Sequence, residues 1–260
     1  MDLGIKGKVF LVTGGASGIG EAICRSIAAE EGIPVIIDRD DKKGVSLANG
    51  LKSSGAFFIK TDLIEESQCK SAVDTTFKKY GRIDSLINNA GLNDGIGLEN
   101  GDLSGFKASL EKNLHHCYMM AQFCLPSLKS NTGSIVNIAS KVAQTGQGGT
   151  SGYAAAKGAI LALTREWALE LLPYNIRVNA ILPAEVMTPM YKQWASSFDD
   201  PDKKIKEIAS KIPLGNRMTT PDEIASMAVF LSSERSSHTT GQLINVDGGY
   251  VHLDRSLVSN

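Results

Sequence analysis

Residues 9–30 read VFLVTGGASGIGEAICRSIAAE, and this stretch decides the fold of the chain. The continuous apolar run from Val9 to Val12 predicts a strand that is buried on both faces. A glycine-rich turn follows, and Glu21 to Glu31 is predicted to form a helix. A strand, a glycine turn and a helix in this order are typical of the first unit of a parallel α/β sheet.

The same alternation continues along the rest of the chain. Further strands are predicted at 35–37, 57–59, 85–87, 135–138, 177–181 and 243–246. Further helices are predicted at about 42–52, 66–80, 103–128, 153–171 and 221–231. Bare apolar strands separated by helices favour a parallel sheet with helices on each face. The sequence therefore predicts an α/β fold, a Rossmann-type doubly wound parallel sheet of about seven strands in a three-layer α/β/α sandwich.

Composition restricts the classes of partner. The 260 residues, 42% hydrophobic and 21% charged, fit a single domain over 1–260. The net charge of −1, without a dense basic run, predicts no nucleic acid and no membrane partner, which leaves a small molecule. The N-terminus is predicted to be a strand, not a signal peptide. The four cysteines lack CxxC pairing, and we expect reduced thiols in the cytoplasm.

Metal-ligand spacing is not seen in the sequence. His115 and His116 are adjacent, where two ligands on one helix face would stand four positions apart. No carboxylates or thiols cluster around them at ligand spacing. We therefore predict no metal site.

The glycine turn has the properties of a dinucleotide site. Gly14, Gly18 and Gly20 are spaced more widely than in GxGxxG, but a predicted strand precedes them and a predicted helix follows. Glycines let the backbone approach a pyrophosphate. The helix N-terminus near Ser17 supplies N–H groups and the positive end of the helix dipole.

An acidic residue follows the second predicted strand at the expected distance from this turn. The carboxylate of Asp38 would hold the adenosine ribose hydroxyls and repel a 2′-phosphate, so the sequence favours NAD over NADP. Two alternatives stay open: Arg39 can accommodate that phosphate, and Asp38 can simply be the N-cap of the next helix.

A second informative stretch, SKVAQTGQGGTSGYAAAK, runs from Ser140 to Lys157. Tyr153 and Lys157 are four positions apart on a predicted helix, so both project from one face. Tyrosine, with a pKa near ~10, needs about 4 kcal/mol to serve as a base at neutral pH. One cation at about 4 Å supplies a similar amount at an effective dielectric of ~20. Taken alone, the pair also fits an ordinary amphipathic helix.

Residues 186–212 mix large apolar side chains with charge directly after a predicted strand end. Ligands of doubly wound sheets bind outside the carboxyl ends of the strands. We therefore predict a substrate lid at 186–212. The alternative is a small helical excursion packed on the surface.

From about residue 5 to residue 250 the chain resembles the short-chain dehydrogenase/reductase family. The residues that match its glycine turn, adenine-pocket acid, NNAG motif and active-site tetrad are Thr13, Gly14, Gly18, Gly20, Asp62, Leu63, Asn88, Asn89, Ala90, Gly91, Asn113, Ser140, Tyr153 and Lys157. The resemblance implies that Tyr153 exchanges the proton and that Lys157 activates it and holds the nicotinamide ribose. It also implies that Ser140 positions the substrate oxygen and that Asn113 anchors a water of a proton relay.

The resemblance further implies a nicotinamide cofactor. Its predicted binding residues follow successive strands: Gly14, Ser17, Gly18, Ile19, Gly20, Asp38, Arg39, Asp62, Leu63, Asn89, Ala90, Gly91, Tyr153, Lys157, Val186 and Thr188. By the same resemblance, Val186 and Thr188 contact the carboxamide.

One departure from the family pattern bears on the substrate. Where the family usually has Pro-Gly, this chain has Pro183-Ala184-Glu185. A buried carboxylate needs partners, and a polyhydroxylated substrate would supply them. The predicted substrate-binding residues are Asn93, Ser140, Gln147, Tyr153, Glu185 and Trp194. For Asn93 and Gln147, and for the further candidates Asp94 and Gln144, ordinary polar loop composition is the alternative.

Four segments resemble bacterial sugar dehydrogenases that oxidise L-fucose and related aldoses. They are NDGIGL (93–98), SKVAQTGQGGTSGY (140–153), PAEVMTP (183–189) and DGGYVHLDRSL (247–257). This resemblance implies hydride removal from the anomeric carbon, with a lactone as product. Alternatives are a 3-oxoacyl or hydroxysteroid substrate, with Met187, Met190, Tyr191, Trp194 and Phe198 as an apolar lining, and a catalytically silent NAD-binding sensor. We also expect a homo-oligomer, a dimer or tetramer, with the tail 250–260 across a subunit contact; disorder of the tail is the alternative.

Overall fold

The computed structural model describes residues 2–253, and within them seven parallel strands form one sheet in the order β3-β2-β1-β4-β5-β6-β7. The strands are β1 (Val9–Thr13), β2 (Ile33–Asp38), β3 (Phe57–Lys60), β4 (Ser85–Asn88), β5 (Ser134–Ile138), β6 (Arg177–Pro183) and β7 (Leu243–Val246). The helices are α1 (Gly18–Ala29), α2 (Asp41–Gly50), α3 (Glu66–Tyr80), α4 (Leu103–Leu110), α5 (His116–Asn131), α6 (Ser151–Glu170), α7 (Pro189–Ala195), α8 (Pro201–Ala209) and α9 (Pro221–Ser232). The predicted doubly wound α/β fold is confirmed.

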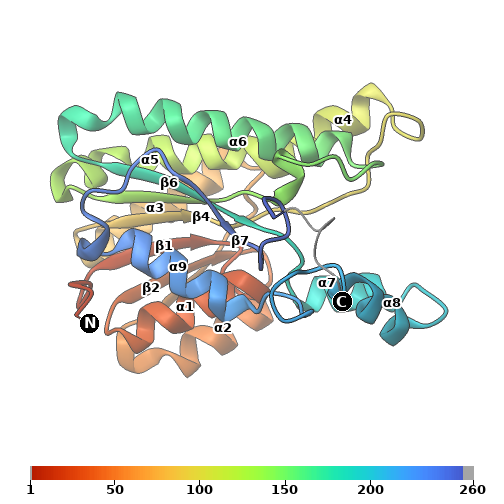
Figure 1. The fold of residues 1–260 in the computed structure, drawn as a ribbon. Helices are drawn as coiled ribbons and strands as arrows, with labels where there is room; N and C mark the ends of the chain where they lie inside the picture. The colour runs from red at the N-terminus through yellow and green to blue at the C-terminus, as the bar shows by residue number, and fades with distance from the viewer. Residues whose placement is uncertain (1, 254–260) are drawn as a thin grey trace.

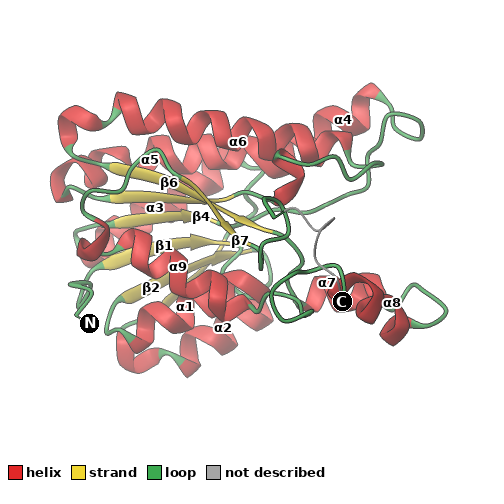
Figure 2. Ribbon diagram, in the orientation of Figure 1, coloured by secondary structure: helices red, strands yellow, loops and turns green. Residues whose placement is uncertain are grey.

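The first strand shows why bare apolar runs predicted a doubly covered sheet. Phe10 and Val12 pack into a core with α1, α2 and α9. Val9 and Leu11 point to the other face, into a core with α3, α5 and α6. Figures 1 and 2 show these two helix layers on opposite sides of the sheet. Because side chains of a strand alternate between faces, a strand buried on both sides is apolar at every position.

The strand order reverses between β1 and β4, which places a crevice at the carboxyl ends of the strands. From β1 the chain proceeds to β2 and β3 in one direction, and from β4 to β7 in the other. The connections that follow β1 and β4 therefore lead to opposite edges of the sheet. Such a switch point is where doubly wound folds bind their ligands.

Two segments differ from the predicted pattern. The predicted helix 103–128 is divided, because a π-helical turn, η2 (Glu111–His115), lies between α4 and α5. Residues 186–212 contain α7 and α8, which project beyond the sheet near its carboxyl end (Figure 1). α7 begins at Pro189 after an N-cap, Thr188, whose hydroxyl accepts from the Tyr191 N–H at 3.2 Å.

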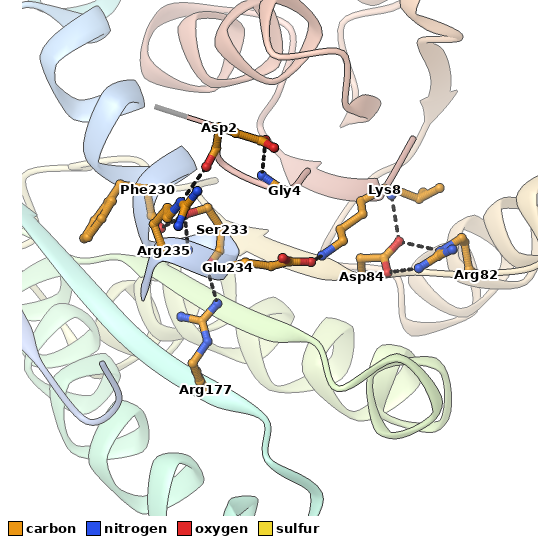
Figure 3. Close-up of polar contacts among 11 residues, drawn as sticks. Asp2, Gly4, Lys8, Arg82, Asp84, Arg177, Phe230, Ser233, Glu234 and Arg235 are labelled. Carbon is orange, nitrogen blue, oxygen red and sulfur yellow. Dashed lines mark hydrogen bonds and ion pairs between the residues drawn. The ribbon is translucent and has the colours of Figure 1, made fainter. Parts of the chain in front are cut away.

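At the opposite end of the strands, ionic and polar contacts tie neighbouring loops together (Figure 3). The Asp84 carboxylate accepts from the backbone N–H of Val9 at 2.8 Å and from the Arg82 guanidinium at 2.6 and 2.8 Å. The Arg177 guanidinium donates to the carbonyls of Leu231 and Ser233, just before and after the end of α9. These contacts satisfy groups at the amino ends of the strands, away from the crevice.

None of the helices within residues 2–253 is long and apolar enough to cross a membrane. The predicted tail 250–260 is covered only in part. The ring of Tyr250 lies 4.0 Å from Nζ of Lys141 in the same chain, and residues 254–260 lie outside the described residues.

Candidate functional site

A cavity of about 510 Å³ opens at the carboxyl ends of the strands. It is lined by most of the predicted cofactor residues: Gly14, Ser17, Gly18, Ile19, Asp38, Arg39, Asp62, Leu63, Asn89, Ala90, Gly91, Tyr153, Lys157, Val186 and Thr188. These residues follow β1, β2, β3, β4 and β6 or lie on α6, so the sheet gathers them from distant parts of the sequence.

The glycine turn is held against the loop after β4. The Asn89 amide donates to the backbone carbonyls of Thr13 at 3.0 Å and Gly14 at 3.1 Å. The Thr13 hydroxyl in turn accepts from the N–H of Asn89 at 3.0 Å and of Ala90 at 3.1 Å. Gly14 has a φ of 61° and Gly18 a φ of 58°, a conformation that glycine adopts without strain. The backbone at the start of α1 is therefore exposed to a ligand, which fits a pyrophosphate.

Gly20 does not line the cavity, but it lets α1 pack under the turn. A Cβ at this position would lie 2.1 Å from the Gly14 carbonyl oxygen and 2.7 Å from the Asn89 amide nitrogen. The first atom belongs to the backbone, so the turn itself would have to shift. Gly20 thus shapes the cavity from behind.

Gly20→Ala is expected to lower the affinity for the nicotinamide cofactor that the sequence predicts at least about tenfold and to destabilise the protein by about 1–3 kcal/mol, because overpacking displaces the turn. Titration of cofactor fluorescence and thermal unfolding measure the two effects. Gly146→Ala is the matched control, since a Cβ there meets nothing within 4 Å. Equal affinity and stability in both variants would show that the turn does not depend on this close approach.

Asp38 ends β2 with its carboxylate fixed at the cavity wall. It accepts from the backbone N–H of Ala16 and of Asp40, each at 3.0 Å. The N-cap of α2 is Asp40, whose side chain accepts from the Lys43 N–H at 3.1 Å. The alternative that Asp38 caps this helix is therefore excluded. Arg39 also lines the cavity, so both predicted determinants of the phosphate preference are present there.

Ser140, Tyr153 and Lys157 line the same cavity. Nζ of Lys157, which is 3% exposed, lies 5.6 Å from the centre of the Tyr153 ring and donates to the Ile138 carbonyl at 2.8 Å. Ser140 lies two positions after the end of β5, where its hydroxyl accepts from the Val142 N–H at 3.4 Å. A hydroxyl, a phenol and an ammonium thus meet at one end of a site whose other end is the glycine turn.

Asn113 lies behind this group and not on the cavity wall. Its side chain accepts from the Leu92 N–H at 2.7 Å and donates to the Ser109 carbonyl at 2.9 Å. The residue is fully buried in the π-helical turn η2. Such turns are frequent at functional sites, where they alter the direction of backbone and side-chain groups.

The structure does not bring the predicted substrate residues Asn93, Gln147, Glu185 and Trp194 to the cavity wall. Asn93 and Gln147 are exposed in loops, and Trp194 is 45% exposed on α7. Gln144 bonds to the Asn245 amide at 2.9 Å.

Glu185 has a partner within the chain and does not need a hydroxylated substrate, so that prediction is wrong. The Glu185 carboxylate pairs with the ammonium of Lys141, and both side chains are largely buried. Lys141 follows Ser140 immediately, whereas Glu185 follows β6. No sequence pattern predicts that these two loops are in contact. The charge is therefore compensated within the chain.

The ion pair extends to two tyrosines. Burial, and next the adjacent Glu185 carboxylate, raise the pKa of Tyr191, whose hydroxyl is hydrogen-bonded to that carboxylate. Tyr191 lies on α7 and lines the cavity. The centre of the Tyr250 ring lies 4.0 Å from Nζ of Lys141. The pair Lys141–Glu185 thus joins α7 and the segment after β7 to the loop that carries Ser140.

Sequence reasoning missed several residues of the cavity wall. They are Thr61, Ile64, Leu92, Lys112, His116, Ile138, Ala139, Pro183, Ala184 and Pro189. Met190 and Tyr191, which the sequence offered only as an apolar lining for another class of substrate, also line the cavity. For His116 the sequence does hold a signal, since the residue stands three positions after Asn113 in the predicted helix 103–128. Among the described residues, no group of three or more His, Cys, Asp or Glu side chains is placed to hold a metal ion.

Comparisons with known proteins agree with this arrangement. The family profile described as enoyl-(acyl carrier protein) reductase matches residues 14–251. An L-fucose dehydrogenase of Oryctolagus cuniculus is 39% identical over 94% of this chain and 84% of its own length. A 3-oxoacyl-(acyl-carrier-protein) reductase, FabG, of Thermotoga maritima is 38% identical over 95% of this chain and 99% of its own. The crystal structure of Cj0485 dehydrogenase superimposes with a TM-score of 0.95 at 48% identity and covers 100% of both chains. The chain belongs to the short-chain dehydrogenase/reductase family of NAD(P)-dependent oxidoreductases.

Proposed function

We propose that the protein oxidises an aldose, L-fucose or a related sugar, at the anomeric carbon to the lactone, with NAD as hydride acceptor. The observation that carries the proposal is the shared cavity of Ser140, Tyr153 and Lys157 with the glycine turn. The choice of sugar is supported by similarity to L-fucose dehydrogenases over 94% of the chain.

In the proposed reaction, Tyr153 acts as the general base. Its phenolate takes the proton of the C1 hydroxyl while the electron pair of the C1–H bond leaves as hydride and a C1=O bond forms. The bound nicotinamide supplies the hydride acceptor. The Lys157 ammonium stabilises the phenolate form by its charge. The Ser140 hydroxyl donates a hydrogen bond to the reacting sugar oxygen, and Asn113 anchors a water through which the proton departs.

The cofactor residues of this chain have matching chemistry. The Asp38 carboxylate accepts from ribose hydroxyls, as Asp62 does at the adenine end, and Lys157 donates to the nicotinamide ribose. Val186 and Thr188 offer backbone and hydroxyl groups to the carboxamide. We propose NAD because the Asp38 carboxylate would face a 2′-phosphate with like charge.

Asp38→Asn is expected to raise the ratio of kcat/KM with NADP to kcat/KM with NAD at least about tenfold, because it removes a negative charge from the ribose site and keeps an acceptor. Initial rates with each cofactor measure the ratio. Asp40→Asn, which removes a charge two positions away outside the cavity, is the control. A ratio unchanged by Asp38→Asn would contradict the assignment of the ribose site.

We propose that residues 186–212 form the substrate lid. Met190 and Tyr191 of α7 already line the cavity, whereas Trp194 is exposed one turn further along the helix. Closure of α7 and α8 over a bound sugar would bring Trp194 towards it. We propose that Asn93 and Gln147 contact the sugar from their own loops, outside the lid. The enzyme is further proposed to act in the cytoplasm as a homo-oligomer; the buried free thiols Cys24, Cys69, Cys117 and Cys124 support a reducing compartment.

One rival function has support of its own. The FabG of Thermotoga maritima is as similar as the L-fucose dehydrogenases, which favours a 3-oxoacyl substrate. A substrate panel of aldoses, 3-hydroxyacyl thioesters and hydroxysteroids, followed by absorbance of the reduced cofactor, separates the two. We expect turnover of L-fucose or a close relative with NAD. Turnover of acyl or steroid substrates only would overturn the proposal, and NAD binding without any turnover would indicate a sensor.

A further inference from the structure

His116 is a buried titratable residue that the reaction described above does not use. It is the first residue of α5, directly after the π-helical turn that contains Asn113, and is 1% exposed. His116 lines the cavity, as do Tyr153 and Lys157. Because it shares the cavity with these two residues, the hydrogen bonds of its ring bear on the chemistry.

One ring nitrogen of His116 has a polar neighbour in the structure, and the other has no hydrogen-bond partner among the described residues. Nδ1 lies 3.6 Å from Sγ of Cys117. The Lys112 backbone carbonyl is a hydrogen-bond partner of the ring. Nε2 is fully buried and has no hydrogen-bond partner among the described residues. Since a carbonyl only accepts, the proton belongs on Nδ1, and Nε2 carries a free lone pair.

The surroundings keep this imidazole neutral. Burial is the main cause that lowers the pKa of His116 to about 4, and the charges of Lys157 and His115 lower it further. The exposed Lys112 is a further cation on the same helix. At neutral pH the ring is therefore an acceptor at Nε2, and the cations around it select against a second proton.

A buried acceptor without a donor is uncommon in folded proteins, and a water usually satisfies it. The Lys157 ammonium is the nearby group that has protons to share, because it carries three and the Ile138 carbonyl takes one. We infer that His116 is a positioning residue: its Nε2 accepts a hydrogen bond from a water that the Lys157 ammonium also contacts. This water and the Ile138 carbonyl hold the ammonium on the side of Tyr153. The inference rests on the proposed function, because it assigns His116 to the proton route out of Tyr153.

Two substitutions separate this role from simple packing. His116→Gln keeps an acceptor close to the position of Nε2, whereas His116→Asn ends near Nδ1 and leaves the Nε2 position without one. We expect His116→Asn to lower kcat about tenfold, the scale of one lost hydrogen bond, and to raise the solvent deuterium isotope effect on kcat. His116→Gln is expected to keep kcat within about threefold. KM and the affinity for NAD are expected to change less than about twofold in both, and His115→Asn, at the exposed neighbour, is the control.

The unmodified enzyme supplies a test that needs no substrate. A two-bond ¹H–¹⁵N spectrum reports the tautomer of each histidine, and the chain has four. The His116 signal is assigned as the one that is lost in His116→Gln or His116→Asn, whichever variant folds. If neither folds, it is assigned by its protection from solvent exchange. We expect this signal to show the Nδ1–H tautomer between pH 5 and 8. An Nε2–H tautomer or an imidazolium at pH 7 would overturn the inference.

The kinetic outcomes are equally distinct. The inference about His116 would also be overturned by an unchanged kcat in His116→Asn, or by an equal loss of kcat in His116→Asn and His116→Gln. Failure of the proposed function looks different, because the parent enzyme would then oxidise no aldose while the tautomer of His116 stayed as expected. The kinetic comparison would in that case use the substrate that the panel identifies.

Discussion

Tyr153→Phe is expected to lower kcat/KM for aldose oxidation by about 10³-fold, with the affinity for NAD changed less than about threefold. General-base catalysis contributes 10²–10⁴-fold in typical enzymes, and phenylalanine keeps the ring but not the proton acceptor. Nζ of the buried Lys157 lies 5.6 Å from the centre of the Tyr153 ring, and both residues line the cavity. Steady-state rates and cofactor titration measure the two quantities.

Tyr118→Phe is the matched control for this substitution. Tyr118 is 52% exposed on α5 and does not line the cavity. Its loss should leave kcat/KM within about twofold of the parent value. Full activity of the Tyr153 variant would remove the proposed base and, with it, the mechanism.

Lys141→Met is expected to destabilise the protein by about 3–5 kcal/mol, because it leaves the Glu185 carboxylate buried without its cation. For a chain of this length that corresponds to a fall in Tm of roughly 10 °C. The loss also frees Tyr191, and with it α7, from the loop of Ser140, so we expect KM for the sugar to rise as well. Thermal unfolding and steady-state kinetics test both expectations.

Two further variants identify the cause. In Lys141→Met/Glu185→Leu both charges are gone, and we expect most of the lost Tm to return, since replacing a buried pair by apolar groups is often neutral or stabilising. Lys70→Met breaks an exposed pair with Asp74 and should have little effect. A double variant as unstable as the single one would show that the unpaired charge is not the cause.

The strands were predictable because burial on both faces leaves a local signature. The predicted strand 243–246 agrees with β7 at both ends, and the glycines and Asp38 stand where backbone approach and charge require them. The residues at the cofactor end of the cavity can be predicted from such local requirements together with the order of the strands. That is why nearly all predicted cofactor residues line one cavity.

The substrate end was less predictable, because it depends on contacts between loops distant in sequence. Lys141 and Glu185 are 44 residues apart, and neither has a neighbour that reveals the pairing. The π-helical turn before His116 has no periodic signal either, since the helix is continuous on both sides. Asn93 and Gln147 lie in exposed loops, and a sequence pattern does not specify how such loops are arranged around a sugar.

The central claim is oxidation at the anomeric carbon, and L-fucose carrying deuterium at C1 tests it most directly. With NAD as acceptor we predict that the deuterium is found on the reduced cofactor and that the product is the lactone or its hydrolysed acid, both measurable by mass spectrometry and NMR. Turnover without deuterium on the cofactor would place the oxidation at another carbon and contradict the account.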